Sequence, residues 1–193
     1  MPEDPYADPV TGVLRNKLGL STTAELETAE REITHAGLIF LKEAPVAPSY
    51  DLTHLCAIHR RVFGDIYVWA GQIRTVAIAK GSWFCLPQYI ESSAAEIFRA
   101  LHGENLLRGL PRAVFTQRLT YYLGEINAIH PFREGNGRAK RAFFEQLASD
   151  AGFAVDWQHL DADRNIAASA AIMRGDSTPM RKMLDELVRE ASP

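Results

Sequence analysis

The spacing of apolar residues predicts a chain built mainly of α-helices. Apolar side chains recur at positions 115, 119, 122, 126 and 129, the three-to-four-residue period of a helix that buries one face. Similar patterns predict helices over about residues 24–42, 52–63, 89–102, 138–149, 164–174 and 180–191, with the 115–129 helix beginning near Pro111. Ser21 or Thr22, and Asp51, are the expected N-caps of the first two helices.

The first of these helices has an apolar face and a charged face. Its inward positions are predicted to be Leu26, Ile33, Leu38 and Leu41, and its solvated charges Glu25, Glu30, Arg31 and Glu32. The residues before it, 1–20, are rich in Pro, Asp and Gly and are expected to form an arm that lies on the domain.

Between Gly71 and Pro87 the period changes from helical to alternating. Residues 73–78 alternate and are rich in β-branched side chains, 80–82 have the composition of a turn, and 83–86 can return, which predicts a short β-hairpin. An isolated hairpin is marginally stable, so it is either a structural excursion or a functional element. In the second case one exposed edge, comprising Thr75, Val76, Ala77 and Ile78, could pair with a strand of a partner peptide.

Composition narrows the class of protein. The 193 residues, 47% of them hydrophobic, suffice for a single compact domain with a real core. A net charge of -3 argues against direct binding to nucleic acid or to an acidic membrane, because those partners require a basic surface. Cys56 and Cys85 lack metal-ligand spacing, and we find no signal peptide and no run of about 18 apolar residues, so a cytoplasmic location is expected.

The densest chemistry lies in residues 130–141, a loop that joins two predicted helices. Gly135, Asn136 and Gly137 stand where the second helix begins, so their free N–H groups and the helix dipole can bind phosphate. Arg138 and Arg141 are three residues apart and can grip phosphate oxygens. Glu134 is the type of ligand that Mg²⁺ uses beside substrate phosphates. His130 is the group in this loop that can accept a proton near neutral pH.

Taken together, these residues resemble a known family. The stretch His130-Pro-Phe-Arg-Glu-Gly-Asn-Gly-Arg-Ala-Lys-Arg141 is similar to the Fic signature H-x-F-x-[D/E]-G-N-G-R-x-x-R at every specified position. Further similarity covers nearly the whole chain and is carried by Tyr6-x-x-Pro9, residues 14–19, 58–63, Trp69-Ala-Gly-x-x-Arg74-Thr75, 104–110 and Gly175-Asp176.

The resemblance implies a fold and an activity. The fold would be a Fic-type helical bundle whose hairpin, about residues 72–87, is a flap that holds the target segment over the active site. The activity would be protein adenylylation: ATP with Mg²⁺ binds the phosphate loop, His130 takes the proton of a Tyr, Thr or Ser hydroxyl, and AMP is transferred to the target. The nucleotide pocket would include Lys80, Gly81, Asn105 and Leu106. Relatives that transfer the terminal phosphate carry Lys where this chain has Gly137, which favours adenylylation.

Two alternatives to this activity remain at the level of sequence. One is a Fic-type transferase of another nucleotide or of a phosphate group, which would differ only in pocket contacts. The other is a nucleotide-dependent binding module without catalysis, which would have no use for the proton acceptor His130.

Control of the activity is also implied by resemblance. Self-inhibited Fic proteins carry [S/T]-x-x-x-E-[G/N], whose Glu pairs with the second signature arginine, here Arg141. The Ser/Thr-x-x-x-Glu segments ending at Glu25, Glu27, Glu32 and Glu96 are followed by Leu, Thr, Ile and Ile, so none completes that motif. Inhibition is therefore expected from a separate small antitoxin. The compact length resembles stand-alone bacterial toxins that act on the ATPase subunits of DNA gyrase and topoisomerase IV.

Overall fold

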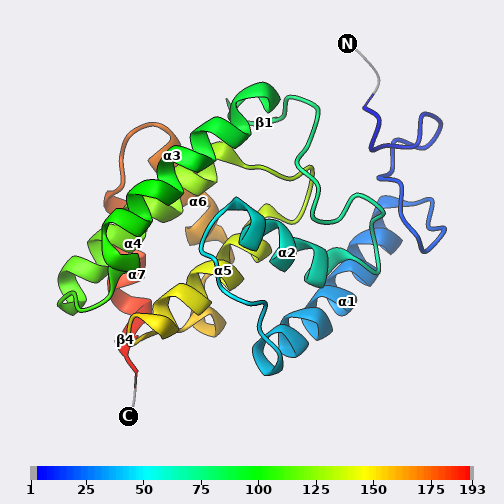
Figure 1. Ribbon diagram of the computed structural model, residues 1–193. Helices are drawn as coiled ribbons and strands as arrows, with labels where there is room; N and C mark the ends of the chain where they lie inside the picture. The colour runs from blue at the N-terminus through cyan, green and yellow to red at the C-terminus, as the bar shows by residue number, and fades with distance from the viewer. Residues whose placement is uncertain (1–3, 192–193) are drawn as a thin grey trace.

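The computed structural model describes residues 4–191 and shows a bundle of α-helices with two very small antiparallel sheets (Figure 1). This confirms the prediction of a mainly helical chain with a short hairpin. The seven α-helices of this part of the chain are α1 (Thr23–Glu43), α2 (Leu52–Phe63), α3 (Ile90–Gly103), α4 (Arg112–Ile129), α5 (Asn136–Asp150), α6 (Ala162–Met173) and α7 (Thr178–Leu187). The 3₁₀ turns are η1 (Pro87–Tyr89), η2 (Asn105–Leu107) and η3 (Trp157–His159).

The N-caps of α1 and α2 follow the sequence prediction. The Thr22 side chain accepts a hydrogen bond from the Glu25 N–H, and Asp51 accepts one from the His54 N–H at 2.8 Å. Each cap satisfies a donor that the first turn of a helix cannot pair internally.

Helices α4 and α5 lie in the middle of the bundle. Helix α5 packs against α2, which in turn packs against α1, while α4 contacts α3, α6 and α7 (Figure 1). Phe115, Leu119 and Phe144 are completely buried at this centre, together with Phe143, which stacks edge-on to Phe144. The loop between α4 and α5 thus joins the two central helices of the bundle.

The arm before α1 lies on the domain. Val13 is buried, Tyr6 packs edge-on against Trp69 at 5.4 Å between ring centroids, and the Asp4 carboxylate pairs with Arg133 at 2.7 Å. Because Arg133 belongs to the loop between α4 and α5, the arm reaches the predicted catalytic segment.

The hairpin is shorter than predicted. Its strands are β1 (Ala79–Lys80) and β2 (Ser82–Trp83), joined by Gly81, and the expected pairing of 73–78 with 83–86 is wrong except for a bond from the Phe84 N–H to the Ile78 carbonyl. The reason is that the chain on either side of the hairpin pairs elsewhere. The Val76 and Cys85 carbonyls accept hydrogen bonds from Arg74, and the Cys85 N–H donates to Ala128 at 2.9 Å.

The last predicted helix is also too long. Helix α7 ends at Leu187, and β4 (Val188–Glu190) pairs with β3 (Phe153–Val155), a sheet that the periodicity does not predict. Val188 and Phe153 are buried against the core, where Phe153 stacks on Phe115. Burial of Val188 against the distant strand β3 overrides the helical pattern of the sequence.

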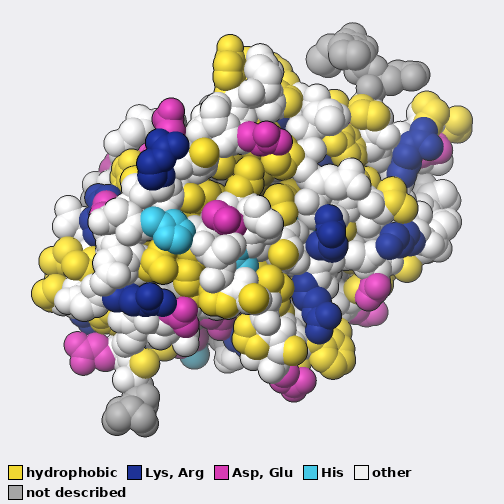
Figure 2. Space-filling model, viewed as in Figure 1, with side chains coloured by type: hydrophobic (Ala, Val, Ile, Leu, Met, Phe, Trp, Pro, Cys, Tyr) yellow, Lys and Arg dark blue, Asp and Glu magenta, His cyan; other side chains and the backbone are white. Residues whose placement is uncertain are grey.

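The surface carries both signs of charge. On the face seen in Figure 2, Lys and Arg side chains are interspersed with Asp and Glu. No helix within residues 4–191 combines the length and the apolar character that crossing a membrane requires.

Candidate active site

The predicted catalytic loop is a tightly closed turn between α4 and α5. His130 caps α4 in the left-handed conformation, with φ 47° and ψ 65°. The Asn136 side chain closes the loop, since its Oδ1 accepts from the Phe132 N–H at 2.8 Å and its Nδ2 donates to the Phe132 carbonyl at 2.7 Å. The amide of Asn136 is therefore structural, and its main-chain N–H remains available at the helix start.

Gly135 is required at its position for two reasons. Its φ is 81°, a region that other residues enter only with strain, and an added Cβ would lie 2.4 Å from the Phe63 ring. Its N–H donates to Oε1 of Glu134 at 2.7 Å, which turns the carboxylate toward the start of α5. The Gly135 N–H is therefore already used by Glu134, and the N–H groups of Asn136 and Gly137 are the donors left for an anion at the start of α5.

A cavity of about 530 Å³ opens beside this turn. Its lining includes His130, Glu134, Asn136, Gly137 and Arg141 of the signature, together with Lys80 and Gly81 of the flap. Five signature residues and two of the four predicted pocket residues therefore meet around one space, whose volume lies in the usual range for a small-molecule site.

The His130 imidazole, which lines this cavity, is neutral. Burial first, and then the charges of Lys140, Arg74 and Lys80, lower its pKa to about 3. Its Nδ1 lies 3.3 Å from the Asn127 carbonyl, and because a carbonyl only accepts, we assign the proton to Nδ1. Nε2 then carries a free lone pair, which is the form a general base requires. The Phe84 ring covers the imidazole at 3.8 Å between centroids.

Arg141 and Arg138 have different environments. Arg141 lines the cavity, and within residues 4–191 no carboxylate accounts for its pKa, which burial and the Arg138 charge lower. Arg138 is not part of the cavity lining. It forms an ion pair with Glu30 of α1, and its Nη1 donates to Thr34 at 3.1 Å. Position 138 is rotated away from the cavity face of α5, where positions 137 and 141 lie.

The prediction that Glu30 is solvated is wrong. Glu30 is only 9% exposed, and its carboxylate accepts hydrogen bonds from both Tyr67 and Arg138. The signal was present in the sequence, because Glu30 and Thr34 follow Leu26 at intervals of four and so share its buried stripe.

His59 supports the catalytic loop from beneath. Its Nδ1 accepts from the Gly71 N–H at 2.8 Å, so Nε2 carries the proton and donates to the Glu134 carbonyl at 2.9 Å. Burial lowers its pKa to about 4, and its ring stacks on Phe132 at 3.9 Å between centroids. This histidine has a structural role, as expected for a residue without a second metal ligand at i+4.

Several residues of the cavity are absent from the sequence prediction. The polar and aromatic ones include Lys140, Trp157 of η3, and Asn165 and Ser169 of α6. Lys140 shares a helix face with Asn136, a signal that the four-residue spacing could have given. Trp157 and α6 are brought to the site only by tertiary packing, and the buried Trp157 Nε1 has no partner within the described residues.

The structure places the two other predicted pocket residues elsewhere. Asn105 and Leu106 do not line this cavity but form η2, a turn after α3 with φ near 55° at both residues. The preceding Glu104 accepts hydrogen bonds from Arg118 and Tyr122, which fixes this turn to α4.

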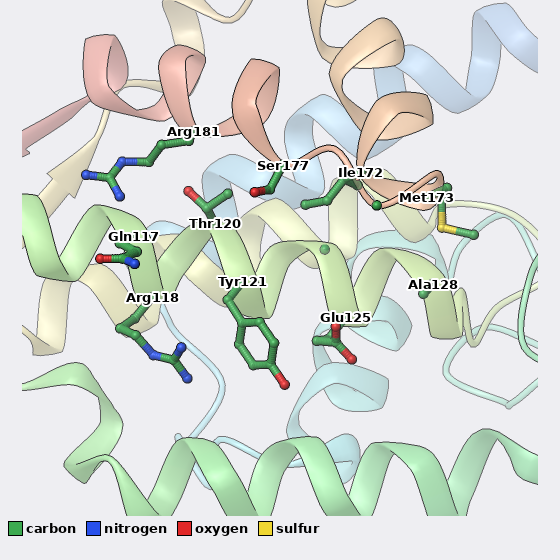
Figure 3. Close-up of a pocket in the computed structure, with 12 residues that line it drawn as sticks. Gln117, Arg118, Thr120, Tyr121, Glu125, Ala128, Ile172, Met173, Ser177 and Arg181 are labelled. Carbon is green, nitrogen blue, oxygen red and sulfur yellow. The ribbon is translucent and has the colours of Figure 1, made fainter.

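A second cavity of similar volume lies along another side of α4 (Figure 3). It is bordered by Arg118 and Tyr121 of α4 and by Ile172, Ser177 and Arg181 from α6, α7 and their connection. It contains no residue of the signature. The chemistry of residues 130–141 therefore belongs to the first cavity.

The residues present fit a magnesium ion only in combination with substrate phosphates. Glu134 supplies one half-exposed carboxylate at the cavity, and within residues 4–191 no cluster of three His, Cys, Asp or Glu could hold a metal without further ligands. Mg²⁺ is commonly held by one or two carboxylates plus substrate oxygens, and this arrangement matches that pattern.

Lys140 makes the stability of the folded protein depend on pH. Its Nζ donates to Asn127 Oδ1 at 2.9 Å, and burial, together with the Arg141 charge, lowers its pKa to about 7. A lysine in the unfolded chain titrates near 10.5, so the unfolded state binds more protons above pH 7 and stability rises with pH there.

We expect Lys140→Met to remove this rise. Between pH 7.0 and 8.5 the wild-type protein should gain roughly 1–2 kcal/mol in its free energy of unfolding from this residue, and the variant should not. Urea unfolding at the two pH values measures the difference. Lys42→Met, at an exposed lysine paired with Glu145, should keep the wild-type rise; a rise that persists in Lys140→Met would contradict the assignment.

Comparisons with known proteins agree with this geometry. The family model described as "Fic/DOC family" matches residues 49–148. The chain is 42% identical over 182 residues to "Protein adenylyltransferase VbhT" of Bartonella schoenbuchensis, covering 94% of this chain but 38% of VbhT. It is 39% identical to "Probable protein adenylyltransferase Fic" of Salmonella typhimurium, covering 97% of this chain and 94% of that protein.

A solved structure agrees in fold. The BepC protein of Bartonella tribocorum, crystallised with bound AMPPNP, superimposes with a TM-score of 0.91 at 24% identity, over 98% of this chain and 99% of that chain. The family match covers half of this chain, and the Salmonella relative matches along nearly its full length. The chain therefore belongs to the Fic/DOC family.

Proposed function

We propose that this protein is an adenylyltransferase that moves AMP from ATP to a hydroxyl group of a target protein. The observation that carries the proposal is one cavity lined by a neutral His130, the start of α5, Glu134 and the basic side chains of Lys80, Lys140 and Arg141. The relatives named protein adenylyltransferases, at 39–42% identity over nearly the whole chain, support the same activity.

The chemical step follows from the site. The target oxygen attacks the α-phosphorus of ATP, its proton passes to Nε2 of His130, and the bond from the α-phosphorus to the bridging oxygen breaks, releasing diphosphate. N–H groups at the start of α5 and the Arg141 guanidinium stabilise the phosphate charge. A bound polyphosphate would also offset the cations that lower the His130 pKa, raising that pKa and making the imidazole a better base.

Magnesium would be held by Glu134 together with phosphate oxygens, where it would neutralise charge on the phosphates. We propose this role because Glu134 is the carboxylate that lines the cavity. Glu134→Ala should weaken Mg²⁺-dependent ATP binding and label transfer together, and transfer that persists without a divalent metal would contradict the role.

The nucleoside end of the cavity is proposed to lie toward η3 and α6. Asn165, Ser169 and the unpartnered Trp157 Nε1 supply hydrogen-bonding groups, and Ile166 and Met173 supply apolar surface. That combination suits a nucleobase and ribose. Competition between ATP and the other nucleoside triphosphates in a binding assay tests it.

The test of the activity uses two labels. The purified protein is incubated with cell lysate and ATP labelled at either the α or the γ position. Adenylylation labels target proteins from α-labelled ATP alone, whereas γ-label on targets would indicate phosphate transfer. Nucleotide binding without transfer of either label would favour a non-catalytic module.

The flap is proposed to hold the target by main-chain pairing. Within the described residues, the main-chain groups of Ala77 and the Ile78 N–H make no hydrogen bond, while the Thr75 N–H is already used by the Tyr6 hydroxyl at 3.0 Å. The main-chain groups available to a target strand are thus those of Ala77 and the N–H of Ile78, next to β1.

Ile78→Pro is expected to reduce label transfer to protein targets strongly while ATP affinity stays unchanged, because proline removes the N–H that a target strand would use. Thr75→Ala is the matched control, since it alters a side chain and leaves the main chain intact. Initial transfer rates and ATP titrations of both variants provide the measurement. A larger loss in Thr75→Ala than in Ile78→Pro would contradict main-chain pairing.

We also propose that the protein is a toxin held by a separate antitoxin, with the ATPase subunits of DNA gyrase and topoisomerase IV as targets. The target rests on family resemblance alone. Glu25, Glu27, Glu32 and Glu96 are exposed, and none of them lies in the cavity lining that includes Arg141. This supports the proposal that an inhibitory Glu comes from another protein, the antitoxin. Purified gyrase and topoisomerase IV subunits should accept the α-label; a many-fold gain in activity on changing one of these glutamates to Gly would instead reveal internal inhibition.

A further inference from the structure

Arg74 is a buried guanidinium bound by main-chain carbonyls. It is 1% exposed, and no carboxylate pairs with it among residues 4–191. Its Nε donates to the His130 carbonyl at 2.8 Å, Nη1 to Val76 at 2.6 Å, and Nη2 to Ile129 at 3.2 Å and to Cys85. A buried charge is costly unless its hydrogen bonds are satisfied, and these four carbonyls satisfy this one.

The four carbonyls belong to two parts of the site. Val76 and Cys85 stand on either side of the hairpin β1–β2, so they are the two ends of the flap tip. Ile129 and His130 are the last residue of α4 and its left-handed cap, whose carbonyls have no partner inside the helix. One guanidinium therefore connects both ends of the flap tip to the residue that carries the proposed general base.

Main-chain bonds reinforce the same connection. The Arg74 N–H donates to the Pro131 carbonyl, and the Cys85 N–H donates to Ala128, both at 2.9 Å. Phe84, next to Cys85, stacks on the His130 ring. The bonds made by Arg74 and by its neighbours therefore fix how close the flap lies to the His130 ring.

We propose that Arg74 is a positioning residue for the transfer reaction. Its guanidinium holds the His130 backbone in the left-handed conformation, which is strained for a residue other than glycine, and fixes the position of the flap relative to the imidazole. A planar fork can bind four acceptors in fixed directions, whereas the ammonium of lysine cannot. The inference rests on the proposed function, because the role assigned to Arg74 is to present a target hydroxyl to His130.

Arg74→Lys tests the role while retaining the charge. We expect the rate of label transfer at saturating ATP to fall about 10²-fold, because small displacements of reacting groups have effects of this size. The half-saturating ATP concentration should stay within about two-fold of wild type, since Arg74 does not line the cavity.

Arg112→Lys is the matched control. Arg112 also donates to carbonyls, those of Val188 at 2.9 and 3.1 Å and of Asp185, but at the opposite end of α4. It should lower stability and leave the rate of label transfer per folded molecule nearly unchanged. An equal loss of rate in both variants, or an unchanged rate in Arg74→Lys, would overturn the proposal.

Hydrogen–deuterium exchange supplies a readout that does not depend on activity. In Arg74→Lys, exchange should increase in peptides covering residues 75–86 and 128–134 and not elsewhere, and in Arg112→Lys it should not increase there. Unchanged exchange in those peptides would overturn the proposal. If the lysine variant does not fold, the exchange of the Arg74 guanidinium protons is measured by NMR in the wild-type protein. Slow exchange supports the proposal, and exchange at the rate of an exposed arginine contradicts it.

The proposed transfer activity and the proposed role of Arg74 are tested separately. Absence of α-label transfer by the wild-type protein would defeat the proposed function. The exchange measurements would still decide whether Arg74 joins the flap to the catalytic loop.

Discussion

Replacing His130 with Ala is expected to reduce transfer of α-label to target proteins by about 10²–10⁴-fold, the usual contribution of a general base. His130 can act as the base because its Nδ1–H is directed to the Asn127 carbonyl, which leaves Nε2 free to accept a proton at the cavity. ATP affinity should change little, because the charges available to the phosphates belong to Arg141, Lys140 and the start of α5. Transfer assays and calorimetric ATP titrations measure the two quantities.

His102→Ala is the control histidine for this experiment. His102 is exposed at the end of α3, where its Nε2 bonds the Ser49 carbonyl at 3.0 Å, and it is absent from the cavity lining. The variant should retain full transfer. If His130→Ala lost ATP affinity and transfer in equal measure, His130 would be a nucleotide-binding residue and the base would have to be sought elsewhere.

The sequence predicts the parts of this site that are local. The predicted phosphate loop is contiguous, so its candidate residues, from His130 to Arg141, can be recognised by their spacing and by their resemblance to a family signature. The helices that carry it also follow from the sequence, because the apolar residues of α4 and α5 recur every three to four positions.

The parts contributed by distant segments cannot be predicted in this way. Asn165 reaches the cavity because α6 packs on α4, and Trp157 of η3 also lines it; no local pattern encodes either position. The spacing of Arg138 and Arg141 predicts that both can grip phosphate oxygens, whereas Arg138 forms an ion pair with Glu30, a residue 108 positions earlier in the chain. In each case the partner is chosen by tertiary packing, and the local sequence specifies only that a polar group is available.

The hairpin shows how one buried side chain can override β-propensity. Residues 73–78 have the alternation of a strand, but the Val76 carbonyl that would pair across the hairpin is bound by Arg74. Ala79–Lys80 and Ser82–Trp83 pair with each other, and one further bond joins the Phe84 N–H to the Ile78 carbonyl. Shortening of the hairpin and attachment of the flap to the catalytic loop therefore have the same cause.

Gly135→Ala is expected to cause the second large loss, in both stability and activity. The new Cβ would lie 2.4–2.8 Å from three atoms of the Phe63 ring, and alanine at φ 81° is strained even without that contact. Phe63 is completely buried and flanked by His59 and Arg138, so the ring has little room to move. Together the two effects should lower the free energy of unfolding by about 2–5 kcal/mol.

The loss of activity should exceed the loss of folded protein. Relief of the clash must shift the start of α5 away from Phe63, and this moves the N–H groups and Glu134 relative to His130, which can reduce the rate about 10²-fold. Urea unfolding and transfer rates per folded molecule separate the two losses.

Gly137→Ala is the matched control for Gly135→Ala. Gly137 has a helical φ, and its added Cβ would meet only the Arg141 guanidinium at 3.4 Å, so this variant should be as stable as wild type or slightly more stable. Adding Phe63→Leu to Gly135→Ala should recover part of the lost activity per folded molecule, because the smaller side chain removes the ring and leaves only the backbone strain. Wild-type stability in Gly135→Ala would show that α5 can begin without the close approach to Phe63, and the fixed geometry assigned to the phosphate loop would then be incorrect.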